Sequence, residues 1–227
     1  MKRGFTILAV LTALLLSFSL YAALVLAPTE QTMGNVQRIF YYHVPSAWVA
    51  FQLFLINFVA SVIYMIRRST KADIVALVTA EVGVVFCTVV LITGPIWARP
   101  VWGIWWTWDL RLTLTLVLWL IYVSYLVLRR FSSSSQTPLL AAVLAIFGAL
   151  DVPLVYFSIW FFRTQHPAPV IGGGGSLDPR MGWVLVSNWI AFMALAWLIC
   201  WTRYQLEVAQ RAVHEAEAMQ SLMEGAR

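Results

Sequence analysis

The sequence predicts an all-α membrane protein, a bundle of six transmembrane helices with both termini in the cytoplasm and three larger loops facing outward. Three observations support this fold class. The 227-residue chain is 61% hydrophobic and only 11% charged, whereas soluble domains contain roughly 25% charged residues. Six apolar runs are long enough to cross the hydrocarbon core, which takes ~20 helical residues. Basic residues are concentrated at alternate ends of these runs, the distribution expected of cytoplasmic loops.

The predicted spans follow one another without a soluble domain or an internal repeat. The first begins after Lys2 and Arg3, and its apolar stretch is longer than that of a typical signal peptide, so we expect a retained helix. The spans are residues 5–27, 47–66, 72–93, 112–128, 138–162 and 183–201. They form one domain, 1–202, and the polar tail 203–227 follows it. Because Glu207 and Arg211 have the i,i+4 spacing of stabilising pairs, we expect the tail to be a cytoplasmic helix.

The orientation follows from the distribution of lysine and arginine. The side with both termini carries ten of them: Lys2, Arg3, Arg67, Arg68, Lys71, Arg129, Arg130, Arg203, Arg211 and Arg227. The other side carries five: Arg38, Arg99, Arg111, Arg163 and Arg180. Since cytoplasmic loops are the more basic ones, loops 28–46, 94–111 and 163–182 are predicted to face outward. Topology thus explains the net charge of +5, and we expect no nucleic-acid partner.

The most unusual segment is the tryptophan-rich part of the second outer loop, 95–111. Five of the 12 tryptophans stand between positions 97 and 108, and Asp109 follows them directly. Tryptophan has a large flat apolar face and one N–H donor, so such a cluster suits either a membrane–water boundary or a planar ligand. Composition and topology leave both interpretations open. Arg111 is close enough in sequence to pair with Asp109 and hold the loop.

Two of the three histidines, His43 and His166, fall in the first and third outer loops. A proline lies near each, which favours extended backbone there. Two neutral imidazoles can take both axial positions of a haem iron. Haem propionates require cations, and four candidates share this side: Arg99, Arg111, Arg163 and Arg180. A zinc site is a poorer match because it takes three or four ligands. The third histidine, His214, is expected to be a solvated residue of the tail.

Two acids and two cysteines fall within the apolar runs. Glu81 and Asp151 are functional candidates because intramembrane acids are costly. The alternative is a buried acid that fixes helix packing, for which Pro153 would free backbone groups near Asp151. Cys87 and Cys200 are far apart and form no C-x-x-C motif. We therefore expect neither thiol–disulfide chemistry nor covalent haem attachment on this chain.

Three segments resemble the tryptophan-rich WWD family of haem-handling membrane proteins in cytochrome c biogenesis. The segment WGIWWTWDLRLT (102–113) is similar to the signature of that family. RIFYYHVPSAW (38–48) resembles the segment around its first external haem-ligand histidine. DVPLVYFS (151–158), followed by RTQHP (163–167), resembles the segment around the second. Larger members carry additional helices and a second histidine pair inside the membrane. No histidine falls in a predicted span here, so we expect a small six-helix member.

The resemblance implies that His43 and His166 are the axial ligands of a b-type haem bound without covalent bonds. The residues implied to contact haem are Trp102, Trp105, Trp106, Trp108 and Asp109, and Arg99 and Arg111 are added as propionate candidates. The resemblance also implies a protein of the bacterial inner membrane, or the equivalent organellar membrane, that presents haem on the periplasmic face. It would pass haem to a membrane-anchored periplasmic haem chaperone. Further implied partners are a small single-helix membrane protein and an ABC-type ATPase/permease pair, and the chain itself is expected not to be an enzyme.

The sequence departs from the family pattern at two places. Leu110 stands where a small residue is common, and Phe161 and Phe162 stand where tryptophans are expected, so the indole N–H donors are lost there. The glycine run 172–175 lacks the Lys-Ser/Thr of a phosphate loop and is interpreted as a linker that lets the third loop fold over the site.

Two alternative functions come from other classes. An ABC-type permease subunit would need a coupling surface for an ATPase, and the inner loops are very short. A b-type electron-transfer cytochrome would place its histidine pairs inside helices rather than in outer loops.

Overall fold

The computed structural model describes residues 2–162, 164–167 and 177–225, and helices account for most of them. Its α-helices are α1 (Lys2–Tyr21), α2 (Phe40–Arg67), α3 (Thr70–Trp102), α4 (Leu110–Phe131), α5 (Thr137–Ala149), α6 (Asp151–Phe161) and α7 (Pro179–Gly225). A π-helical turn, η1 (Ala22–Leu26), extends α1, and a 3₁₀ turn, η2 (Asn35–Ile39), leads into α2. Six segments are long and apolar enough to cross a membrane, with α5 and α6 together forming one of them. The predicted all-α bundle of six spans is confirmed.

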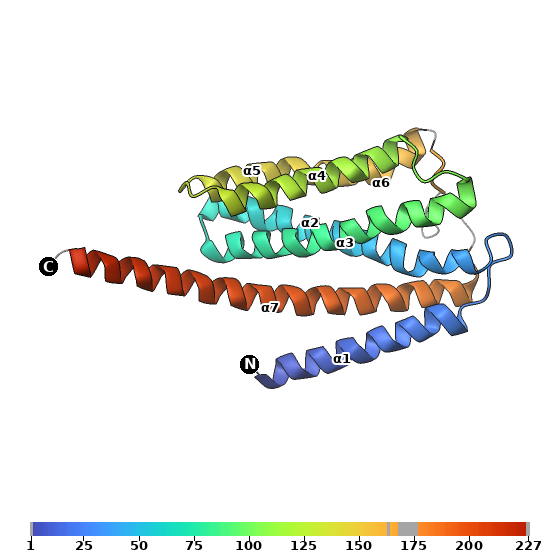
Figure 1. Cartoon of the computed structure of the whole chain (residues 1–227), viewed down its shortest axis with the longest axis horizontal. Helices are drawn as coiled ribbons and strands as arrows, with labels where there is room; N and C mark the ends of the chain where they lie inside the picture. Colours follow the sequence, from blue (N-terminus) through green and yellow to red (C-terminus); the bar gives the residue numbers. More distant parts are fainter. Residues whose placement is uncertain (1, 163, 168–176, 226–227) are drawn as a thin grey trace.

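The helices run up and down along one axis, with both termini at the same end of the bundle (Figure 1). We call this the terminal end; the short α2–α3 and α4–α5 connections also lie there (Figure 1). The connections after η1, α3 and α6 lie at the opposite end, which we call the loop end (Figure 1). The alternation expected from the positive charges is therefore present. That the terminal end is the cytoplasmic one stays a prediction.

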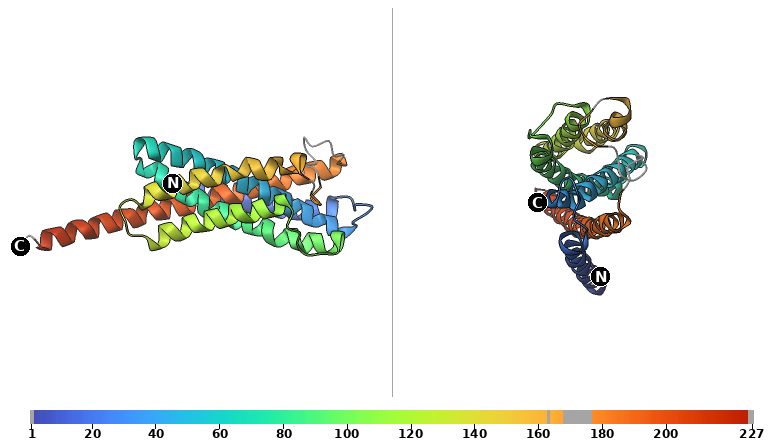
Figure 2. Two further views of the ribbon diagram at one scale, coloured as in Figure 1. Left: turned by 90° about the horizontal axis from the view of Figure 1, so that it is seen from above. Right: turned by 90° about the vertical axis from the view of Figure 1, so that its right-hand side faces the viewer.

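The core is built around the α2–α3 hairpin, against which α4, α5 and α7 pack. The ring of Phe54 on α2 stacks on that of Tyr122 on α4, with centroids 3.8 Å apart and planes 12° from parallel. Gly83 on α3 makes this stack possible, because a Cβ there would lie 2.7 Å from the Phe54 ring. α1 lies at the periphery beside α7 (Figure 2). Many large apolar side chains of these helices face outward, as expected of a surface in contact with lipid.

Helix α3 is longer than predicted, since it continues to Trp102 rather than ending at residue 93. Pro95 and Pro100 lie inside it. Gly103, with a φ of 79°, ends the helix in the left-handed conformation that favours glycine. Asp109 then caps α4, its carboxylate accepting from the Leu112 amide at 3.1 Å. The loop predicted at 95–111 is thereby shortened to the connection 103–109.

The fifth predicted span, 138–162, is divided into α5 and α6. Pro153 has no amide hydrogen to donate to the Ala149 carbonyl, so the α-helical pattern is interrupted one turn before it. Leu150 between the two helices keeps right-handed helical angles, and the two segments remain one crossing. Asp151 is buried at the start of α6, and its Oδ2 has no hydrogen-bond partner among the described residues.

Helix α7 has 47 residues, which corresponds to about 70 Å at a rise of ~1.5 Å per residue. This exceeds a hydrocarbon core of roughly 30 Å, and the helix projects beyond the bundle at the terminal end (Figure 1). The tail from 203 is helical as expected and continues the sixth span without a break. The predicted Glu207–Arg211 pair is present at 2.9 Å.

An ion-pair network joins α3, α4 and α7 near the terminal end. Asp73 accepts from Arg129 at 2.5 Å and from Arg211 at 2.8 Å. Arg203 bridges Glu81 at 2.7 Å and Glu207 at 3.3 Å. Of the two open interpretations of Glu81, the structure favours helix packing, because its carboxylate is paired with a cation from α7.

Candidate functional site

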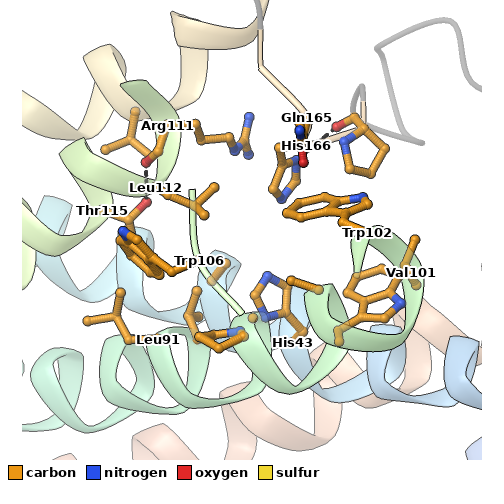
Figure 3. A pocket seen from close by; sticks show the side chains of 18 of the residues that line it. His43, Leu91, Val101, Trp102, Trp106, Arg111, Leu112, Thr115, Gln165 and His166 are labelled. Carbon is orange, nitrogen blue, oxygen red and sulfur yellow. Dashed lines mark hydrogen bonds between the residues drawn. The ribbon is translucent and has the colours of Figure 1, made fainter. Parts of the chain in front are cut away.

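A cavity opens at the loop end between α2, α3, α4 and the segment after α6 (Figure 3). It encloses about 1160 Å³ of space free of protein atoms, including its open mouth. Its walls are mainly apolar, with polar groups at a few points. The residues at those points are His43, Trp97, Trp102, Trp106, Arg111, Thr115, Gln165 and His166. A mostly apolar pocket with a few convergent polar groups is typical of a cofactor site.

His43 lies in the first turns of α2 and not in a loop, which corrects the sequence-based placement. The helix begins at Phe40, and Pro45 stands inside it. Pro45 is the sixth residue of the helix, so it removes the hydrogen bond that an amide there would donate to the Tyr41 carbonyl. His43 therefore falls within the second candidate span. The expectation that no histidine lies in a span is wrong, and the loop-placement argument against a b-type cytochrome now applies to His166 alone.

The imidazole of His43 is held from behind by α3. Its Nδ1 lies 2.9 Å from the Thr93 hydroxyl oxygen, and its ring packs edge-on against Trp97, with centroids 5.8 Å apart. The side chain is only 8% exposed. The other ring nitrogen, Nε2, has no protein partner among the described residues, and the ring extends into the cavity (Figure 3).

His166 lies in the segment after α6, on the opposite side of the cavity from His43 (Figure 3). Its Nδ1 lies 2.9 Å from the Pro167 carbonyl, which can only accept, so Nδ1 carries a proton. Its amide donates to the Thr164 hydroxyl at 3.1 Å. Burial and, to a smaller extent, the positive charge of Arg111 lower the pKa of His166 to about 4. The ring is neutral at pH 7, and the Nε2 lone pair is free to bind a metal.

The tryptophans divide into two groups. Trp97, Trp102 and Trp106 line the cavity, whereas Trp105 and Trp108 are 59% and 76% exposed and lie outside its lining. The position of the first group suits contact with a planar ligand, and that of the second suits a membrane–water boundary. The first group forms cavity wall, and the second offers apolar surface at the rim, where a membrane boundary or another protein would meet it.

The charged residues of this segment have separate roles. Asp109 caps α4 and accepts from the Thr107 hydroxyl at 2.9 Å. In the described part of the chain its carboxylate forms no ion pair with Arg111, so that expectation is wrong. Arg99 is exposed and donates to the Gly103 carbonyl. Of the arginines proposed for propionates, Arg111 alone lines the cavity among those described; Arg180 pairs with Asp178 at 3.0 Å. Arg163 and the glycine run 172–175 lie outside the described residues.

Three buried donors around the cavity lack a partner within the part of the chain that the structure describes. They are the indole Nε1 atoms of Trp97 and Trp106 and the Nη1 of Arg111. A buried donor without an acceptor costs about 1–3 kcal/mol. Because all three are donors, the missing group is one that accepts hydrogen bonds. A planar ligand with carboxylates at its edge, such as a haem, satisfies this requirement, and two imidazoles suit its iron.

Comparison with known proteins identifies the family. The model of the heme exporter protein C family (CcmC) matches residues 1–219. The chain belongs to the heme exporter protein C family. The heme exporter protein C of Bradyrhizobium diazoefficiens is 35% identical over 94% of this chain and 82% of its own length. That of Escherichia coli K12 is 31% identical over 76% and 74%. A ccmC-like mitochondrial protein of cytochrome c biosynthesis from Marchantia polymorpha is 29% identical over 74% and 72%.

Membership in the heme exporter protein C family confirms the resemblance found in the sequence. It supports a multi-pass membrane protein that handles haem in cytochrome c biogenesis. A small six-helix member was expected because no histidine fell in a predicted span, and that reason is incorrect. The family match now supports the same choice.

Sequence reasoning missed two residues of the site, Thr93 and Gly94. Thr93 was the last residue of the predicted third span, and Gly94 was the first residue of the predicted second outer loop. No local signal marks them, because their importance comes from the approach of His43 across the helix interface.

Proposed function

We propose that this protein binds haem between His43 and His166 at the outer face of the membrane and presents it to a membrane-anchored haem chaperone. One observation carries the proposal. Two neutral imidazoles, one from α2 and one from the segment after α6, extend into a single cavity from opposite sides (Figure 3). The haem is expected to be b-type and non-covalent: Cys87 lines the cavity, but Cys87 and Cys200 do not form the C-x-x-C motif of covalent attachment.

The cavity residues would hold such a ligand in one orientation. Trp102 and Trp106 offer flat apolar surface to the macrocycle. Arg111 supplies a guanidinium with a free buried N–H for a propionate, and charge-assisted hydrogen bonds of this kind are the strong ones. Among the described residues no cluster of three His, Cys, Asp or Glu is present. The two imidazoles are the nitrogen ligands that the described lining of this cavity offers a metal.

The two ligands differ in a way that suits release. His43 is buried on a helix and held by a side chain of α3, whereas His166 is half-buried on a connecting segment and held by its own neighbouring carbonyl. We infer that a docking chaperone displaces His166 first. Trp105 and Trp108, exposed beside the cavity, offer the apolar surface such a partner would cover.

The covalent chemistry of loading would belong to haem and the chaperone, since this chain binds and orients a reactive group. A small single-helix membrane protein and an ABC-type ATPase/permease pair complete the proposed partners. The proposed location is a bacterial inner membrane, or its organellar equivalent, with the loop end on the periplasmic side.

The test is a visible spectrum of the protein purified in detergent after co-expression with the chaperone. We expect bis-imidazole haem in the wild type, and its loss or weakening in His43→Ala and His166→Ala. His214→Ala, which changes an exposed histidine of α7, is the matched control and should keep the full spectrum. A wild type without haem, or full haem and full transfer in both single variants, would refute the mechanism.

A further inference from the structure

The hydroxyl of Thr93 stands behind His43 and has a defined role in hydrogen bonding. A hydroxyl has one hydrogen to donate. Thr93 donates it to the Val89 carbonyl of its own helix at 2.7 Å. Toward His43 Nδ1, at 2.9 Å, the Thr93 oxygen can then only accept. The hydrogen between them therefore belongs to His43.

This arrangement decides the tautomer of His43. With the proton on Nδ1, a neutral imidazole carries its lone pair on Nε2, the nitrogen without a protein partner among the described residues. His43 is 8% exposed, so bulk water does not provide an alternative acceptor at Nδ1. One threonine thus selects which nitrogen is available to a metal.

The neighbours of Thr93 on α3 fix the position of the ring. The ring lies close to the backbone of α3 at Gly94, where a Cβ would be in van der Waals contact with His43 Cε1 at 3.4 Å. Trp97, one turn after Thr93, packs edge-on against the same ring. Together Thr93, Gly94 and Trp97 restrict the position and rotation of His43.

We propose that Thr93 is a positioning residue that holds His43 with its proton on Nδ1 and aims Nε2 at the iron of a bound haem. The inference rests on the proposed function, in which haem lies between His43 and His166. Partners that accept the other N–H of a ligating histidine fix its orientation and raise its basicity. Their removal typically weakens metal affinity by about 10–100-fold.

The first test compares Thr93→Val with Thr93→Ser in the full-length protein, freed of haem and titrated with ferric haem in detergent. Valine keeps the shape of the side chain and removes the acceptor. We therefore expect the dissociation constant for haem to rise by about 10–100-fold and the low-spin bis-imidazole spectrum to be lost. Serine keeps the acceptor and should restore both.

Thr88→Val is the matched control. Thr88 lies on the same helix, donates to the Val84 carbonyl at 2.7 Å and accepts from Trp119 Nε1 at 2.8 Å, whereas the hydroxyl bonded to His43 is that of Thr93. We expect it to bind haem as the wild type does. An equal loss in Thr88→Val and Thr93→Val would mean that the effect is a general weakening of α3, and the proposal would be wrong.

The second test reads the tautomer of His43 in the wild-type protein and leaves both His43 and Thr93 unchanged. The chain has three histidines, so nitrogen NMR of the ¹⁵N-histidine-labelled haem-free protein in bilayers can resolve each, with His214→Ala and His166→Ala for assignment. We expect His43 to carry its proton on Nδ1. A proton on Nε2 would overturn the inference.

The two proposals fail in different ways. If His43→Ala binds haem like the wild type, the haem-ligand assignment itself is wrong. If His43→Ala loses haem while Thr93→Val keeps wild-type affinity and spectrum, only the role of Thr93 is wrong.

Discussion

Replacing Arg111 with methionine should stabilise the haem-free protein and weaken haem binding. The Nη1 of Arg111 is buried at the cavity without a partner. An unsatisfied buried donor costs about 1–3 kcal/mol, and methionine of similar length removes that donor. The predicted gain in unfolding free energy is therefore on the order of 1 kcal/mol, or about 2–4 °C in Tm for a chain of this size.

The same change removes the cation offered to a propionate. A hydrogen bond to a charged group contributes about 1.5–3 kcal/mol. At 1.4 kcal/mol per tenfold change, the dissociation constant for haem should therefore rise by roughly 10–150-fold. The assay pairs thermal unfolding of the haem-free protein with haem titration. Arg180→Met, at an exposed arginine paired with Asp178, is the control and should change neither measurement. A variant that is less stable without haem and binds haem normally would show that Arg111 is structural.

Three further predictions concern pH and packing. The pKa of His166 lies near 4, below its usual 6.5, because of burial. The unfolded state therefore binds more protons between these values, and the unfolding free energy should fall as pH falls from 6.5 to 4; His166→Gln should flatten this slope, and an unchanged slope would contradict the assignment. Gly83→Ala places a Cβ 2.7 Å from the Phe54 ring and should cost about 1–3 kcal/mol by overpacking, measured by chemical unfolding; no loss would mean that the ring moves freely. Asp73→Ala leaves the buried guanidinium of Arg129 on α4 without its anion. The free energy of unfolding should fall by about 3–5 kcal/mol, visible as a lower Tm; a loss below about 1 kcal/mol would mean that water reaches the Arg129 guanidinium.

Several features of the fold could be predicted because their causes are local in sequence. Apolar length decides how many times a chain crosses a membrane, and the six runs gave the six observed spans. The pair Glu207–Arg211 was predictable because helix geometry places residues four apart side by side. The tryptophan-rich segment and the two histidines were visible as composition.

Helix ends were less predictable, and the proline near His43 was taken to favour extended backbone. Pro45, Pro95 and Pro100 all lie inside helices. Each removes one backbone hydrogen bond, a local cost that tertiary packing can override. His43 was therefore placed in a loop when it is on α2.

The sequence by itself determined that this is a six-span bundle with imidazoles and indoles at one end, because apolar length and charge act through nearby residues. Only the tertiary structure decided which of these side chains share a cavity. Trp106 and Trp108 are two residues apart, yet one lines the cavity and the other is exposed. Thr93 reaches His43 across 50 positions of sequence. Such contacts depend on how two helices are rotated against each other, and packing over the whole bundle sets that rotation.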